Sequence, residues 1–120
     1  MSVKHKAQTL TIHCIDFRFQ KMIDEDLKNR GLFGKFDRIS WAGSSKDLEN
    51  VAANASISLR LHDPDEVIIY EHEDCGAYGE NNSEEIHREN AQKLANLLKE
   101  IKPQLAVSSL IATLDGVKEL

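Results

Sequence analysis

Two cysteines and one histidine are the residues of this chain whose types and spacing could support chemistry. His72 and Cys75 are three residues apart, so one tight turn can offer an imidazole and a thiolate to the same ion. Cys14, much earlier in the chain, could complete the set. Two thiolates and one imidazole suit Zn²⁺, and three protein ligands leave a fourth coordination position open. The pattern predicts a zinc site that can admit water or a substrate.

Asp16 and Arg18 follow Cys14 at intervals of two residues. If the backbone stays extended, the three side chains share one face. Because two thiolates formally cancel the charge of the ion, a zinc-bound water should be acidified only modestly, and a hydrogen-bond acceptor beside it gains importance. Asp16 is predicted to be that acceptor. Arg18 is predicted to keep the carboxylate ionised and oriented.

Each of these residues also has an ordinary structural interpretation. Free cysteine is among the most buried residue types, and Asp16 with Arg18 can be a plain surface ion pair. The remaining candidates are predicted to be a solvated acidic loop (Glu71, Glu73, Asp74), surface or core histidines (His5, His13, His62, His87) and a packing residue (Trp41). Only the joint arrangement of Cys14, His72 and Cys75 favours a metal.

The elements that would position these residues alternate between strands and helices. Apolar periodicity predicts strands at 8–15, 37–41, 67–70 and 106–114. Helices are predicted from Phe19 to Gly31, from Leu48 to Asp63, and from Ser83 to Lys102. This order predicts one α/β domain over residues 1–120, an open parallel sheet of about four strands with helices on both faces. The metal ligands fall after strand ends, where ligands of such sheets bind. The first strand is more polar than a covered strand should be.

Composition narrows the class of protein. The chain has 120 residues, of which 41% are hydrophobic and 29% charged, and these values fit a globular domain. A formal net charge of −5 argues against a nucleic-acid partner. No segment has the length of a membrane span or the apolar region of a signal peptide, so a cytoplasmic protein is expected. In a reducing compartment, two cysteines are better interpreted as ligands or thiols than as a disulfide.

Two segments together carry a family resemblance. Cys14-Ile15-Asp16-Phe17-Arg18 and His72-Glu73-Asp74-Cys75-Gly76 resemble the paired C-x-D-x-R and H-x-x-C-G motifs of the β-class carbonic anhydrases. The resemblance covers almost the whole chain. It implies zinc on Cys14, His72 and Cys75, with Asp16 and Arg18 as a catalytic dyad. In that family a zinc-bound hydroxide attacks carbon dioxide and gives bicarbonate, so a carbonate dehydratase, or zinc lyase, is implied.

The resemblance further implies a homodimer, because active sites of this family lie at a dimer interface. In some members the aspartate binds zinc directly, and the sequence leaves open which arrangement holds here. Three departures from the family stand out. Phe17 replaces a common serine, Ser40-Trp41 replaces an Arg-Asn pair, and the chain begins almost at its first strand, without the N-terminal helices of typical members.

Two other functions remain open. The first is a related zinc hydrolase that acts on carbonyl sulfide or carbon disulfide, since Phe17 and Trp41 would make an apolar pocket suited to sulfur compounds. The second is a non-catalytic metal-binding or partner-binding domain that keeps the site without a complete pocket. The lyase is favoured over both.

Overall fold

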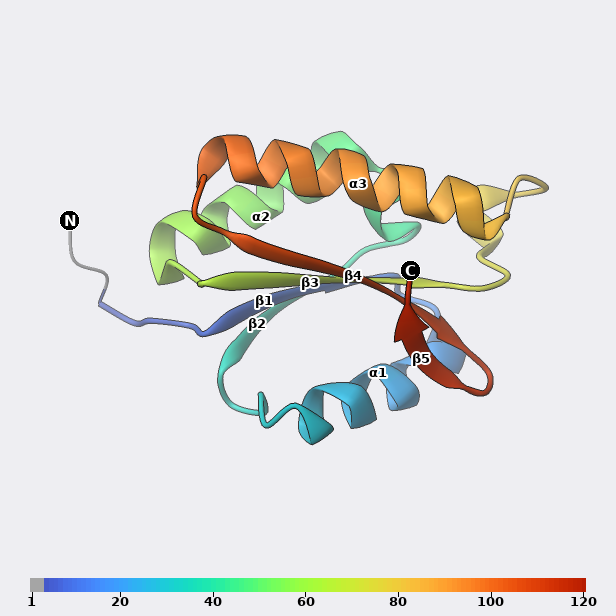
Figure 1. Ribbon diagram of the computed structural model, residues 1–120, viewed down its shortest axis with the longest axis horizontal. Coiled ribbons are helices and arrows are strands. Elements are labelled where there is room, and N and C mark those ends of the chain that lie inside the picture. Colours follow the sequence, from blue (N-terminus) through green and yellow to red (C-terminus); the bar gives the residue numbers. More distant parts are fainter. Residues whose placement is uncertain (1–3) are drawn as a thin grey trace.

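A computed structural model describes residues 4–120, which form one α/β domain around a five-stranded sheet (Figure 1). The strands are β1 (Thr9–His13), β2 (Phe36–Ser40), β3 (Glu66–His72), β4 (Ala106–Thr113) and β5 (Gly116–Glu119). Their order in the sheet is β2-β1-β3-β4-β5, with every neighbouring pair parallel except β4 and β5. The predicted α/β class with a parallel sheet is confirmed. The expectation of about four strands omits β5, which returns antiparallel to β4 after a tight turn at Asp115.

Three helices cover the sheet, namely α1 (Phe17–Asn29), α2 (Leu48–His62) and α3 (Glu84–Ile101). Two short 3₁₀ turns, η1 (Ser44–Lys46) and η2 (Gly76–Tyr78), follow β2 and β3. Figure 1 shows α2 and α3 on one face of the sheet and α1 on the other. Side-chain caps set two of the helix starts, because Asp16 accepts from the Arg18 amide and Ser83 from the Ile86 amide.

The two faces of the sheet carry separate apolar cores. Phe19, Ile23 and Leu27 recur every four residues and form the stripe by which α1 packs on β3 and β4. On the other face, α2 and α3 cover alternate residues of β1 and β3, including Leu10, Ile12, Val67 and Ile69. Ile101 is 50% exposed because it is the last residue of α3 and lies beyond the buried stripe of the helix. His87 and Ala91 extend the buried stripe toward the start of α3 instead.

The polar residues of β1 are buried, and each has a hydrogen-bond partner. Thr9 donates to Glu66 at 2.8 Å and Thr11 to the Asp37 carbonyl at 3.1 Å. His13 donates through Nδ1 to the Cys14 carbonyl at 2.8 Å, while its buried Nε2 has no hydrogen-bond partner. These bonds offset the loss of hydration, so a polar strand can occupy a covered position in the sheet.

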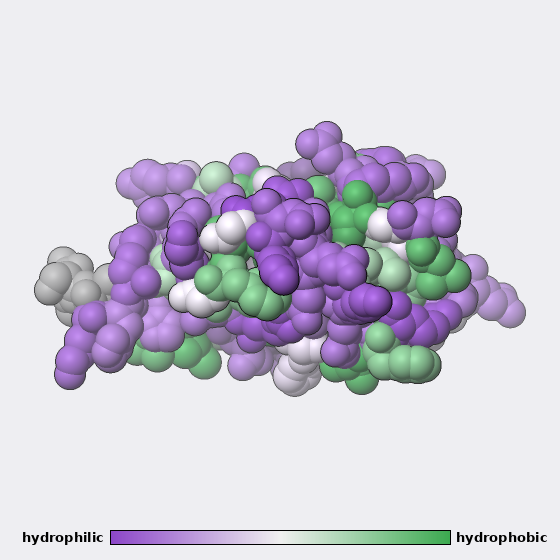
Figure 2. Space-filling model, turned by 90° about the horizontal axis from the view of Figure 1, so that it is seen from below, coloured by the Kyte–Doolittle hydropathy of each residue, from purple (hydrophilic) through white to green (hydrophobic). Residues whose placement is uncertain are grey.

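The surface is mixed in character. The face seen in Figure 2 is mostly hydrophilic, and its hydrophobic residues form several separate patches. Within residues 4–120, no helix has both the length and the apolar character that a membrane crossing requires.

Candidate metal centre

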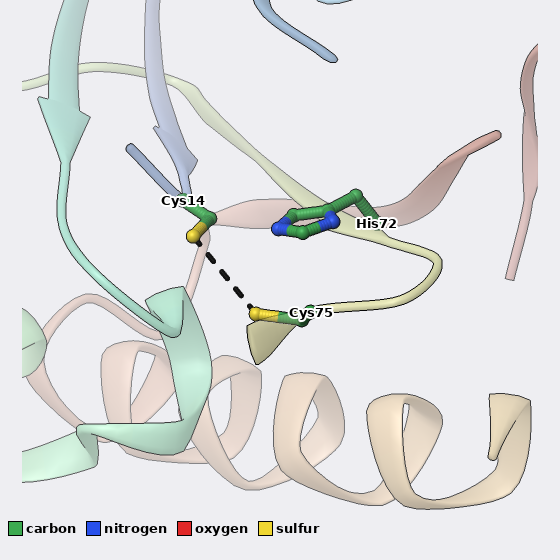
Figure 3. A group of neighbouring side chains, drawn as sticks. All are labelled: Cys14, His72 and Cys75. Carbon is green, nitrogen blue, oxygen red and sulfur yellow. Dashed lines mark hydrogen bonds between the residues drawn. The ribbon is translucent and has the colours of Figure 1, made fainter. Parts of the chain in front are cut away.

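Cys14, His72 and Cys75 meet at the carboxyl ends of two neighbouring strands. Cys14 follows β1 directly, His72 is the last residue of β3, and Cys75 lies in the loop before η2 (Figure 3). All three are buried, and one ligand atom from each lies within 4.8 Å of the others. The sequence prediction that these residues converge is confirmed, and together they can hold a metal ion.

The donor atoms fit a tetrahedral ion. The Cys14 and Cys75 sulfurs are 3.9 Å apart, and two sulfurs bound to one tetrahedral zinc would be about 3.8 Å apart. His72 donates from Nδ1 to the Glu73 carbonyl at 2.7 Å, while its buried Nε2 has no hydrogen-bond partner. In metal-binding histidines, one ring nitrogen usually donates a hydrogen bond to a carbonyl or carboxylate, and the other nitrogen is then free to bind the metal. Phe19 stacks on the ring at 4.5 Å between centroids and fixes its plane.

The two thiols differ in acidity. The hydrogen bond between the two sulfurs lowers the pKa of Cys14, with His72 and the Gly43 amide acting in the same direction against burial. The same sulfur–sulfur bond, together with burial, raises the pKa of Cys75. A bound divalent cation would favour the thiolate form of both residues.

The loop after β2 forms one wall of the site. The Gly43 amide donates to the Cys14 sulfur at 3.3 Å. Gly43 has a φ of +79°, and a Cβ at this position would lie 3.1 Å from the Ala77 side chain. Glycine is required here because its backbone adopts this conformation without strain and approaches the Cys75 loop closely.

Asp16 and Arg18 lie at the edge of the metal centre. Arg18 donates to both oxygens of Asp16, with Nη2 2.7 Å from Oδ2 and Nε 3.1 Å from Oδ1. The condition of an extended backbone is not met, because α1 begins at Phe17 and Asp16 is its N-cap, accepting from the Arg18 amide at 2.9 Å. The contact between the two side chains nevertheless forms, since capping places them side by side.

The Asp16 carboxylate faces the centre without belonging to the cluster of three ligands. Its Oδ2 is 4.0 Å from Nε2 of His72. The Arg18 guanidinium is the main reason that the pKa of Asp16 falls to about 2. Arg18 also donates to the side chain and carbonyl of Asp74, at 3.1 and 2.9 Å. One guanidinium thus ties the start of α1 to the loop between His72 and Cys75.

The other candidate residues divide between confirmed and wrong predictions. Trp41 packs against the core beneath α2 and donates from its indole to Asp47 at 2.8 Å, as a packing residue would. Phe17 is 84% exposed. His87, predicted to be a surface or core histidine, is 1% exposed and lies in the core. The acidic-loop prediction is wrong for Glu71, which is 2% exposed because β3 continues past Tyr70 and turns it inward.

The chain is an α/β domain with a buried cluster of two thiols and one imidazole at the carboxyl edge of its sheet, and this cluster could bind a metal ion. A family model described as "Putative carbonic anhydrase" matches residues 4–117. The chain therefore belongs to this carbonic anhydrase family, and the β-class resemblance of its two motifs is confirmed.

Similar proteins agree with this placement. An uncharacterized protein from Rickettsia bellii is 33% identical over 134 residues, which cover 96% of this chain and 82% of the relative. An uncharacterized protein from Rickettsia conorii is 31% identical over 134 residues, which cover 96% of this chain and 72% of the relative. The crystal structure of the β-carbonic anhydrase CafA of Aspergillus fumigatus matches with a TM-score of 0.57 at 17% identity, covering 97% of this chain and 76% of that one. At this identity the likeness shows a shared fold.

Proposed function

We propose that this protein is a zinc-dependent carbonic anhydrase, which interconverts carbon dioxide and bicarbonate. The observation that carries the proposal is the convergence of Cys14, Cys75 and the unpartnered Nε2 of His72 beside a paired Asp16 and Arg18. Membership of the carbonic anhydrase family supports it. A reducing compartment such as the cytoplasm would keep both free thiols available to the ion.

The chain's own residues define the roles in this reaction. Cys14, His72 and Cys75 would hold the zinc ion, which when bound supplies a Lewis acid that lowers the pKa of a coordinated water. Asp16 would accept a hydrogen bond from the attacking oxygen and orient it toward carbon dioxide. Its lowered pKa keeps it ionised at neutral pH, so it acts there as an acceptor rather than an acid. Arg18 would fix the direction of the Asp16 carboxylate.

We also propose that two copies of the chain associate next to the metal centre. Phe17, Leu114 and Ile15 are 84%, 69% and 55% exposed. Phe17 lies between the proposed catalytic residues, and the Leu114 amide donates to Glu73 in the metal loop at 2.7 Å. A contiguous exposed apolar patch commonly marks an interaction site, and we infer that a second copy of the chain covers these side chains. Light scattering should give a dimer mass that Phe17→Ser lowers, whereas a monomer mass for the unmodified protein contradicts this proposal.

Asp16→Asn tests the catalytic proposal. The variant should retain one zinc per chain but lose about 100-fold in kcat/KM for carbon dioxide hydration, because an amide is a weaker acceptor and also offers a competing donor. Stopped-flow assays on samples of measured zinc content give both numbers. Asp74→Asn is the matched control, since Asp74 also binds Arg18 but its side chain is 81% exposed. It should keep nearly full activity.

Other outcomes separate the alternatives. Zinc-loaded protein that releases sulfide from carbonyl sulfide or carbon disulfide, and does not hydrate carbon dioxide, identifies the hydrolase. Full zinc with no turnover of any of these compounds identifies a binding domain. Equal activity in Asp16→Asn and the unmodified protein refutes the role given to Asp16.

A further inference from the structure

A buried carboxylate that the proposed reaction does not use lies directly beside the metal centre. Glu71 faces α2 and α3, as Val67 and Ile69 do, because side chains alternate along β3. Glu71 is 2% exposed to solvent. A carboxylate in such a place is costly unless hydrogen bonds and an opposite charge satisfy it. Its partners therefore indicate why the fold keeps it.

Three donors from three separate segments converge on Glu71. Ser45 of η1 donates to Oε2 at 2.7 Å. Tyr78 of η2 and His87 of α3 donate to Oε1, each at 2.7 Å. All three donor residues are buried. One carboxylate thus joins η1, which is distant in sequence, to η2 and to the start of α3.

The ring of His87 extends the network to the metal loop. Its Nε2 is 2.7 Å from Oδ1 of Asn82, whose amide nitrogen donates to the Cys75 carbonyl at 2.9 Å. Both ring nitrogens therefore face oxygen atoms, and the ring links Glu71 to the loop that carries Cys75.

Two of the segments held by Glu71 reach the cysteine ligands, since one contacts the Cys14 sulfur and the other follows Cys75 directly. Ser45 is two residues beyond Gly43, whose amide contacts the Cys14 sulfur. The Tyr78 amide donates to the Cys75 carbonyl at 3.0 Å, the same oxygen that Asn82 binds.

We propose that Glu71 is the positioning residue of the metal centre. Through Ser45 on one side and Tyr78 and His87 on the other, its carboxylate fixes the separation of the Cys14 and Cys75 sulfurs. It also precedes His72 directly on β3. The inference rests on the proposed zinc site but not on carbon dioxide being the substrate. Outer hydrogen-bond partners of metal ligands typically contribute about 10–100-fold to metal affinity.

Zinc affinity and a cobalt spectrum test the inference. Glu71→Gln should weaken zinc binding about 10–100-fold in competition with a chromophoric chelator. Its Co²⁺ derivative should show weaker and shifted thiolate charge-transfer bands. Tyr78→Phe removes one donor and should change both readouts in the same direction by a smaller factor.

Tyr70→Phe is the matched control. Tyr70 also donates its hydroxyl to a carboxylate, Asp26, at 2.6 Å, but on the α1 face and without a link to the cysteine segments. The zinc affinity and cobalt spectrum of Tyr70→Phe should match those of the unmodified protein, even if the thermal unfolding midpoint of this variant is lower. If Glu71 had only a structural role, Glu71→Gln would show the same pattern as this control, with a lower unfolding midpoint but an unchanged zinc affinity and cobalt spectrum.

The outcomes are distinguishable. Unmodified zinc affinity and spectra in Glu71→Gln and Tyr78→Phe overturn the inference. If Glu71→Gln does not fold, Ser45→Ala and Tyr78→Phe decide by the same two measurements. Zinc binding that depends on Glu71, in a protein without carbon dioxide hydration, refutes the proposed function while the positioning role stands. Failure of the unmodified protein to bind zinc overturns both.

Discussion

Both ends of the sheet bring carboxylates together with partners from other parts of the chain. At the amino ends of the strands, Lys6 and Lys102 bind Asp63 and Asp65, with Lys6 Nζ 2.8 Å from Asp65 and Lys102 Nζ 2.7 Å from Asp63. A hollow of about 700 Å³ lies beside Lys6. At the carboxyl ends, Glu71 and His87 form a pair at 2.7 Å beside the metal centre.

Burial separates the two ends. The side chains of Lys6 and Asp65 are 43% and 72% exposed, whereas those of Glu71 and His87 are each 1% exposed. Exposed pairs are screened by water and salt and contribute little, while a buried pair must be satisfied on every side. Neither charge nor a hollow therefore distinguishes the end of the sheet that carries the proposed metal centre. The marker is a buried imidazole nitrogen without a partner beside two thiols.

Removing the metal should produce the largest difference between the two ends. A ligand at about a thousandfold excess over its Kd stabilises the fold by about 4 kcal/mol. For a domain of this size the unfolding midpoint should fall by on the order of 10 °C when a chelator removes zinc. Circular dichroism melts of zinc-loaded protein with and without chelator measure this shift.

Variants at the two ends sharpen that measurement. Cys75→Ser should melt at one temperature with or without chelator, because it has lost a ligand. Lys6→Met, at the opposite end, should keep the full response to the chelator. An unchanged midpoint after proven removal of zinc would show that the centre contributes nothing to stability.

The metal ligands could be predicted from sequence because their evidence is local. His72 and Cys75 share one loop, Cys14 follows an alternating strand, and both lie where a parallel sheet places its ligands. The pairing of Asp16 with Arg18 was also predictable, though its cause was not. Asp16 and Arg18 could either continue a strand or cap and begin a helix, and these two cases require different backbones. Only the fold shows that Asp16 caps a helix.

The positioning network could not be predicted, because its members are joined only by tertiary contacts. Glu71 directly follows an apolar run, and a polar residue there ordinarily ends a strand. Recognising it as buried requires knowing that Ser45, Tyr78 and His87 meet it from three other segments. The fifth strand escaped prediction for a similar reason, since 116–119 has a strand-like pattern only once β4 is present beside it.

A smaller effect is expected at the amino end. Lys102 donates to Asp63 and to the Pro64 carbonyl, at 2.7 and 2.6 Å, and its hydrogen bond lowers the pKa of Asp63 below the ordinary 3.8. A carboxyl with a lowered folded-state pKa stabilises the fold above its ordinary pKa and loses that contribution as the pH falls. Lys102→Met should lower the unfolding midpoint by a few degrees at about pH 7, and the difference should shrink toward about pH 3.

Melts of metal-free protein at both pH values isolate this contribution from that of zinc. Lys6→Met is the comparison variant, and its effect should be smaller, since the Lys6 side chain is 43% exposed and that of Lys102 only 19%. The difference in midpoint caused by Lys102→Met could also stay constant in acid. In that case Lys102 stabilises the protein through the packing of its aliphatic chain and not through its charge interaction with Asp63. If that difference equals the zinc effect, the contrast between the two ends of the sheet fails, because an exposed ion-pair cluster would then contribute as much as the buried metal centre.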